Sequence, residues 1–250
     1  MSLSRRHVLL AGLGLAFTGC ASTSGSRSAA GGRPGPLWPE DVKRPTPTKS
    51  AASTSRPADG YRPIHRPKGD LPTAAAAAPP APAGVLPRKH WTRHGITSRN
   101  INAMNGVKKI TIHHEGWTPF TATSAAATYD RIESIRQIHT RDRGWSDIGY
   151  HFIIDRQGRI VEGRPLAYQG AHVSENNPHN MGILVLGNFE KQTPSKKQVE
   201  ALGRFTRQMM KAHRVPASRV RTHKEINPTQ CPGRHLQAQV DLLRRRGTLA

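Results

Sequence analysis

Residue types that bind transition metals are spread over the C-terminal part of the chain. His113 and His114 stand together in the segment ITIHH, His223 opens the segment HKE, and Cys231 follows in CPG. Two neutral imidazoles and one thiolate suit Zn²⁺, and three protein ligands leave a fourth coordination position open. The combination predicts a catalytic metal site, because a structural zinc site would use four protein ligands.

Each of these residues also has an ordinary interpretation. The chain contains 13 histidines, so an adjacent pair is weak evidence for a metal site when taken alone. Cys231 alone fits a small buried apolar residue. The other cysteine, Cys20, lies far away in the chain and in a different sequence context. The metal hypothesis therefore depends on the three ligand types occurring together.

The pattern of apolar residues predicts the elements that must position these side chains. Strands alternate with helices, which favours the α/β class: a single domain with a central, mostly mixed β-sheet flanked by helices. Thr193 is the expected N-cap of one helix, with Pro194 in its first helical position. The expected strands are 107–113, 150–155, 160–163 and the fully apolar 181–186, and the expected helices are 122–140, 193–215 and 236–246.

The N-terminus has the features of an export signal. A twin-arginine run, SRRHVLL, precedes an apolar stretch that is too short to span a bilayer. The segment FTGC resembles a bacterial lipobox, with Phe17 in place of the usual aliphatic residue, so we expect residues 1–20 to be a lipoprotein signal and Cys20 to be acylated. The alternative is a plain cleaved signal with an incidental cysteine. We expect an exported protein, anchored to a membrane in the periplasm through its N-terminal lipid. The outer membrane is preferred because Ala21 is not acidic.

Residues 21–84 are rich in Pro, Ala and Ser and have few large apolar residues, which predicts a disordered linker before a domain at 85–250. The formal net charge is +22, and residues from Val85 onwards hold 27 Lys or Arg against 12 acidic residues. Such a surface suits nucleic acid, anionic lipid or an acidic polymer. We expect no nucleic-acid partner, because no groove-reading motif is present and export argues against one. We expect a monomer.

From His113 to Cys231 the chain resembles the type 2 N-acetylmuramoyl-L-alanine amidases, a family that includes amidase-type phage lysozymes and the animal peptidoglycan recognition proteins. The resemblance covers roughly residues 86–243. The ordered blocks that carry it are ITIHH at 110–114, GWSDIGYHFII at 144–154, GAH at 170–172, MGI at 181–183, GNF at 187–189, HKE at 223–225 and CPG at 231–233.

The resemblance implies a function and roles for individual residues. It implies hydrolysis of the amide bond between the lactyl group of N-acetylmuramic acid and L-alanine of the peptidoglycan stem peptide. His113, His223 and Cys231 would hold zinc, with His114 a neighbour and not a ligand. Tyr150 matches a tyrosine that hydrogen-bonds the attacking water or the developing oxyanion.

The chain departs from some relatives beside the metal site. Some amidases carry a lysine that stabilises the oxyanion two residues before the cysteine ligand. This chain has Thr229 at that position, and the animal recognition-type amidases also have a threonine there. Residues 183–186 contain no acid, whereas the cytoplasmic branch has a glutamate in this strand. These departures leave open an alternative function, a peptidoglycan-binding recognition module with little or no turnover.

Three further residues are candidates for contacting the substrate. His172 aligns with a family position near the substrate groove, although a satisfied loop hydrogen bond is an equal alternative. Asn180 and His114 are weaker candidates of the same kind. Glu115 follows the histidine pair, where the family usually has Thr or Ser, and we expect its side chain to point into solvent.

Overall fold

A computed structural model describes residues 82–98 and 100–249. The expected signal peptide, Cys20 and most of the expected linker lie outside these residues. The strands are β1 (Val85–Leu86), β2 (Lys109–His114), β3 (Phe152–Ile154), β4 (Ile160–Glu162), β5 (Asn180–Val185) and β6 (Val220–Thr222). The α-helices are α1 (Ala125–Arg141), α2 (Lys196–His213) and α3 (Arg234–Arg245), and the short 3-10 helices are η1 (Arg88–His90), η2 (Ala217–Arg219) and η3 (His223–Glu225).

The described strands form one mixed sheet in the order β1-β4-β3-β5-β2-β6. Neighbouring strands are parallel except for the β3–β4 hairpin, which is antiparallel. The central strand β5 is buried along its whole length, as its continuous apolar sequence predicts. The predicted α/β domain with a mixed sheet flanked by helices is therefore confirmed.

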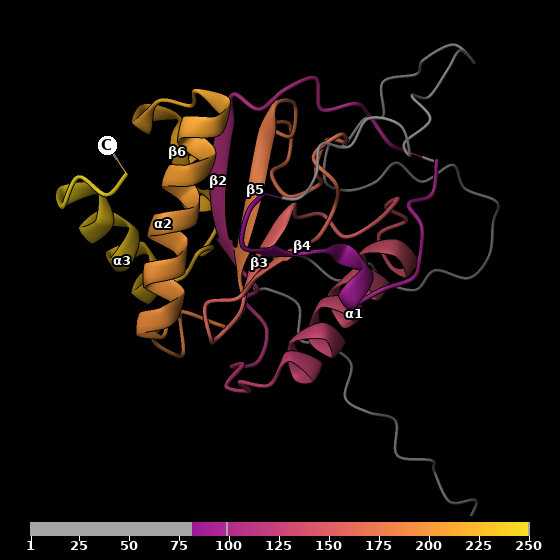
Figure 1. Ribbon diagram of the computed structural model, residues 1–250, viewed down its shortest axis with the longest axis horizontal. Helices are drawn as coiled ribbons and strands as arrows, with labels where there is room; N and C mark the ends of the chain where they lie inside the picture. The colour runs from indigo at the N-terminus through magenta and orange to yellow at the C-terminus, as the bar shows by residue number, and fades with distance from the viewer. Residues whose placement is uncertain (1–81, 99, 250) are drawn as a thin grey trace, which may run out of the picture. The chain divides into compact units, whose positions relative to one another are not determined.

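Helices cover both faces of the sheet, with α2 and α3 on one face and α1 on the other (Figure 1). Alternate residues of β2 and β5, such as Ile112 and Ile183, pack with Phe205 of α2 and Leu236 of α3. On the opposite face, Ile132 of α1 belongs to a second cluster that takes Leu184 from β5 but no residue from β2 or β6. The part of this face above β2 and β6 is consequently not packed as an apolar core, and the metal-binding residue types lie there.

The expected elements are present with shifted ends, and two short strands, β1 and β6, were not expected. The two-residue strand β1 pairs with β4 in parallel, Val85 with Ile160. The β3–β4 turn is the predicted hairpin, in which Gly158 has φ of +76° and donates its N–H to the Asp155 carbonyl at 2.9 Å. Among the described residues, no helix has both the length and the apolar character needed to cross a membrane.

The predicted N-cap of α2 is wrong by two residues. Ser195, not Thr193, caps the helix: its hydroxyl accepts a hydrogen bond from the Gln198 N–H at 3.1 Å, and the Gln198 side chain accepts one from the Ser195 N–H at 3.0 Å. This reciprocal capping box satisfies two backbone donors, which a cap at Thr193 could not match. Pro194 therefore precedes the cap instead of occupying the first helical position.

Replacing Ser195 with alanine should lower the free energy of unfolding by about 1 kcal/mol, because the capping hydrogen bond is lost. Thr193→Ala is the matched control and should leave stability nearly unchanged. Urea unfolding followed by circular dichroism measures both variants. Equal losses in the two variants would contradict the assignment of Ser195 as the N-cap.

Candidate metal centre

The register between β2 and β6 brings the two histidines together. Ile112 pairs with Thr222 in parallel, so His113 and His223 each follow a paired residue on adjacent strands. Cys231 lies in the segment between η3 and α3. The ligand atoms of the three residues all lie within 4.8 Å of one another. Residues separated by more than 100 positions in the sequence thus meet over one end of two paired strands.

Cys231 is held in place by its backbone and by its sulfur. The Cys231 carbonyl accepts a hydrogen bond from the Lys224 N–H at 2.8 Å, and its own N–H donates to the Thr229 hydroxyl at 3.2 Å. The His114 N–H donates to Cys231 Sγ at 3.4 Å. A backbone donor aimed at the sulfur favours the thiolate, which is the form that binds metal.

The separation of two of the ligand atoms, those of Cys231 and His113, fits a tetrahedral zinc ion. Cys231 Sγ lies 3.6 Å from His113 Nδ1. Bond lengths of about 2.3 Å for zinc–sulfur and about 2.05 Å for zinc–nitrogen, at a tetrahedral angle, place the two ligand atoms about 3.6 Å apart. The donor set and this distance both suit zinc, and His114 contributes a backbone N–H, not a ligand atom.

The environment keeps His113 neutral. Burial lowers the pKa of His113 well below its usual range, and repulsion from His223, His172 and His114 lowers it further. A protonated imidazole has no lone pair for a metal, so the depressed pKa favours the binding-competent form.

Tyr150 lies beside these ligands, just before β3. Its ring centroid is 5.2 Å from that of His113 and 6.2 Å from that of His172. The side chain is only partly buried, which leaves part of the tyrosine accessible from solvent. Thr229 stands two residues before Cys231 and accepts its N–H. Both predicted assisting residues are thus placed next to the proposed ligands.

The three candidates for substrate contact make hydrogen bonds inside the protein. His172 is 8% exposed and lies with Nδ1 3.0 Å from His113 Nε2. Asn180 is fully buried and accepts the Thr111 hydroxyl at 2.9 Å. His114 Nδ1 accepts the Phe189 N–H at 3.1 Å. Their contact with substrate remains a prediction.

The expectation that Glu115 points into solvent is wrong. Its side chain is buried and forms an ion pair with Arg131 of α1. Burial raises the pKa of Glu115 to about 7, against the opposing effect of the Arg131 charge. Arg131 also lies over the Trp117 ring, with its guanidinium carbon 5.0 Å from the ring centroid. A carboxylate is usually exposed to solvent. Here Arg131 of α1 forms an ion pair with Glu115, which offsets part of the cost of burying the charge.

Sequence reasoning missed a buried arginine that supports the loops around the site. Arg164 is 1% exposed and donates to the carbonyls of Asp147, Ile148 and Gln169 at 3.0, 2.8 and 2.7 Å. It therefore joins the segment before Tyr150 to the segment before His172. The only signal in the sequence is an arginine directly after a strand, which is too common to identify such a residue.

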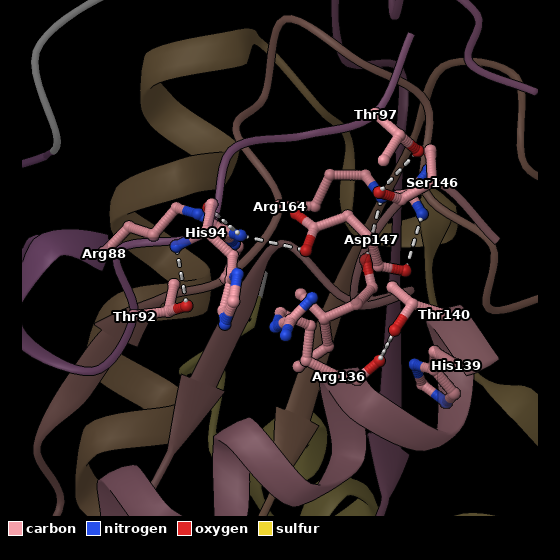
Figure 2. A network of polar contacts seen from close by, with 12 residues as sticks. Arg88, Thr92, His94, Thr97, Arg136, His139, Thr140, Ser146, Asp147 and Arg164 are labelled. Carbon is pink, nitrogen blue, oxygen red and sulfur yellow. Dashed lines mark hydrogen bonds and ion pairs between the residues drawn. The ribbon is translucent and has the colours of Figure 1, made fainter. Parts of the chain in front are cut away.

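A second arginine extends this network to the start of the domain (Figure 2). Arg88 binds the Asp147 carboxylate at 2.9 Å and donates to the Gly163 carbonyl at 2.9 Å. Burial raises the pKa of Asp147, while the charges of Arg88 and Arg164 oppose that shift. The first residues of the described chain are in this way bonded to the segment that leads to Tyr150.

A family model and curated relatives both identify the same protein family for this chain. The family model for N-acetylmuramoyl-L-alanine amidase, Amidase_2, matches residues 103–234. Peptidoglycan-recognition protein SC1a of Drosophila melanogaster is 30% identical over 161 residues, which cover 62% of this chain and 83% of that protein.

Solved structures with the same fold include a peptidoglycan-recognition protein and an amidase. A point mutant of Drosophila PGRP-LB in complex with tracheal cytotoxin aligns with a TM-score of 0.58 at 26% identity, over 63% of this chain and 92% of that one. The N-acetylmuramoyl-L-alanine amidase LysC from Clostridium intestinale aligns with a TM-score of 0.52 at 25% identity, over 64% and 97%. With a family model that matches more than half of its length, the chain belongs to the Amidase_2 family of N-acetylmuramoyl-L-alanine amidases.

Proposed function

We propose that the chain is a zinc-dependent N-acetylmuramoyl-L-alanine amidase that releases stem peptides from peptidoglycan or muropeptides. The observation that supports this most directly is the intact ligand set: His113, His223 and Cys231 converge within 4.8 Å, in a member of the amidase family. Three protein ligands would leave the fourth position of a zinc ion open for water or substrate, as a catalytic site requires.

The reaction is the hydrolysis of one amide bond. Water supplies a hydroxyl to the lactyl carbonyl carbon, the carbon–nitrogen bond breaks, and the amino group of L-alanine leaves with a proton. When bound, zinc supplies a Lewis acid that polarises the carbonyl and promotes deprotonation of water. His113 in its neutral form, His223 and the thiolate of Cys231 would hold this ion.

Tyr150 and Thr229 are the proposed assisting residues. The Tyr150 ring centroid lies 5.2 Å from that of His113, and this proximity supports a role for its hydroxyl in orienting the attacking water or donating to the oxyanion of the tetrahedral intermediate. Thr229 stands on the Cys231 side of the site and offers a neutral hydroxyl. Because a hydroxyl is a weaker oxyanion partner than a lysine ammonium, we expect the Tyr150 hydroxyl to contribute more.

A product assay tests the proposed function. Defined muropeptides are incubated with the zinc-loaded protein, with the chelated protein, and with the chelated protein after zinc is restored. We expect free stem peptide and intact sugar, identified by mass spectrometry, only in the first and third samples. Tight muropeptide binding without product in any sample would instead identify a recognition module, in keeping with the recognition proteins among its relatives.

Tyr150→Phe should lower kcat by roughly 100- to 1,000-fold, the usual cost of losing one oxyanion donor. Zinc content and muropeptide affinity should remain close to those of the unmodified protein, because the ring is retained. Tyr129→Phe, a change on the partly buried surface of α1, is the matched control. An unchanged kcat in Tyr150→Phe would remove this residue from the mechanism.

We also propose that the protein is exported and anchored through a lipid on Cys20, with a periplasmic location and a preference for the outer membrane. The support is the twin-arginine run and the FTGC segment. Metabolic labelling with a fatty acid tests this: Cys20→Ser should abolish the label and release the protein from membranes. A labelled Cys20→Ser variant would contradict the proposal.

A further inference from the structure

Two histidines and a backbone carbonyl form a continuous hydrogen-bonded chain that ends at the metal site. His172 Nε2 lies 3.1 Å from the carbonyl oxygen of Asn180. His172 Nδ1 lies 3.0 Å from His113 Nε2. The remaining ring nitrogen of His113, Nδ1, is the atom 3.6 Å from Cys231 Sγ.

The carbonyl determines where the protons lie in this chain. A carbonyl oxygen can only accept, so His172 must carry its proton on Nε2. A neutral imidazole has one N–H, which leaves a lone pair on His172 Nδ1. That lone pair accepts the proton on His113 Nε2, and His113 Nδ1 is then unprotonated.

We propose that His172 is a positioning residue that holds His113 in the tautomer and ring orientation whose Nδ1 lone pair faces the metal. The inference rests on the proposed zinc site. It assigns to His172 a role distinct from contact with substrate, because both of its ring nitrogens are engaged inside the protein.

The surroundings fix the His172 ring as firmly as its hydrogen bonds do. The ring is packed against the backbone of Gly170 and Gly182, and a Cβ at Gly182 would lie 2.7 Å from His172 Cδ2. The backbone N–H of His172 donates to the Asn177 side chain at 2.9 Å. Rotation of the ring to another position would require these neighbours to move. Burial also makes a charged imidazole costly here, which favours the neutral form that the proton order requires.

The carbonyl at the far end is itself anchored to the sheet. Asn180 begins β5 and pairs with Lys109 of β2, the strand that carries His113. Its side chain accepts the Thr111 hydroxyl at 2.9 Å and donates to the Asn176 carbonyl at 2.9 Å. The series of hydrogen bonds therefore begins on β5 and ends on the neighbouring strand β2. Two paired strands, and not a loop alone, orient the His113 ligand.

A pair of amide variants tests the role of His172. In His172→Asn the side-chain oxygen lies near the position of Nδ1 and can still accept the His113 proton. In His172→Gln the amide reaches the position of Nε2 and leaves His113 Nε2 without its acceptor. Loss of an outer partner of this kind typically lowers metal affinity by about 10- to 100-fold. We expect that loss in His172→Gln and nearly full affinity in His172→Asn, measured by competition with a chromophoric zinc chelator.

The tautomer itself can be measured without metal or substrate. Long-range ¹H–¹⁵N correlation spectra of the zinc-free protein should show His113 protonated on Nε2, and His172→Gln should shift it towards a mixture of tautomers. Circular dichroism and thermal unfolding establish that both variants are folded.

Two results would overturn the proposal: His113 protonated on Nδ1 in the unmodified protein, or equal zinc affinities in the two variants. Neither readout involves turnover, so failure of the proposed amidase activity would remain distinguishable from failure of this inference.

Discussion

Replacing Cys231 with serine should remove bound zinc and reduce stem-peptide release to background. A serine hydroxyl is not ionised at neutral pH and lacks the soft sulfur that zinc prefers. The activity should fall by more than the roughly 100-fold that loss of a supporting residue costs, because one of three ligands is lost. Zinc content is measured by elemental mass spectrometry on the purified protein, alongside peptide release.

Cys231→Asp is the matched comparison, since a carboxylate can also bind zinc. It should recover part of the zinc content that Cys231→Ser loses. The His114 N–H that now points at the sulfur would be available to either replacement. Full zinc content and full activity in Cys231→Ser would exclude Cys231 as a ligand and end the zinc-amidase proposal.

The zinc-free protein should lose stability steeply as the pH falls below about 6.5, because several buried histidines stay neutral only while the chain is folded. Burial lowers the pKa of His151 to about 3 and that of His139 well below its usual range. Unfolding exposes both rings to water, where they bind protons near pH 6.5.

The unfolded state therefore binds more protons than the folded state between about pH 6.5 and the depressed values, and unfolding is favoured as the pH falls. For His151 this window extends down to about 3. Each such histidine changes the free energy of unfolding by about 1.4 kcal/mol per pH unit. The stability is fully present above pH 6.5 and is lost progressively below it. Urea unfolding at pH 7.5, 6.5, 5.5 and 4.5 measures the slope.

His139→Asn should reduce this slope. The asparagine oxygen lies near the position of Nδ1 and can keep the hydrogen bond from the Gly149 N–H, which is 3.0 Å long. The control is His90→Asn, because His90 is exposed in the folded chain. The same slope in both variants would show that acid unfolding has another origin.

The parts of the fold that depend on repeating patterns are predictable from the sequence. The apolar run at 181–186 has the length and composition of a buried strand, and it forms the central strand β5. The turn between β3 and β4 contains Gly158, whose positive φ suits glycine. The three ligand types are also recognisable, because only a few side chains bind zinc.

Features that depend on one partner from elsewhere in the chain were not predictable. β1 is only two residues long, which is too short for alternation to be visible. Glu115 is buried because Arg131 reaches it from α1, and nothing near Glu115 in the sequence indicates this. The contact between His172 and His113 joins residues 59 positions apart. Local patterns contain no information about such pairs, which form only when the sheet assembles.

The parallel register of β2 and β6 makes the site sensitive to changes of chain length. Thr222 turns towards α3, where its hydroxyl donates to the Gln237 side chain at 2.7 Å, and His223 follows it at the metal site. Deleting one residue of β6 would move His223 into the position of Thr222 and turn its ring to the other face of the sheet. The metal site therefore tolerates substitutions in this strand but not single insertions or deletions. Alignment gaps within residues 220–222 would mark relatives that have lost the zinc site.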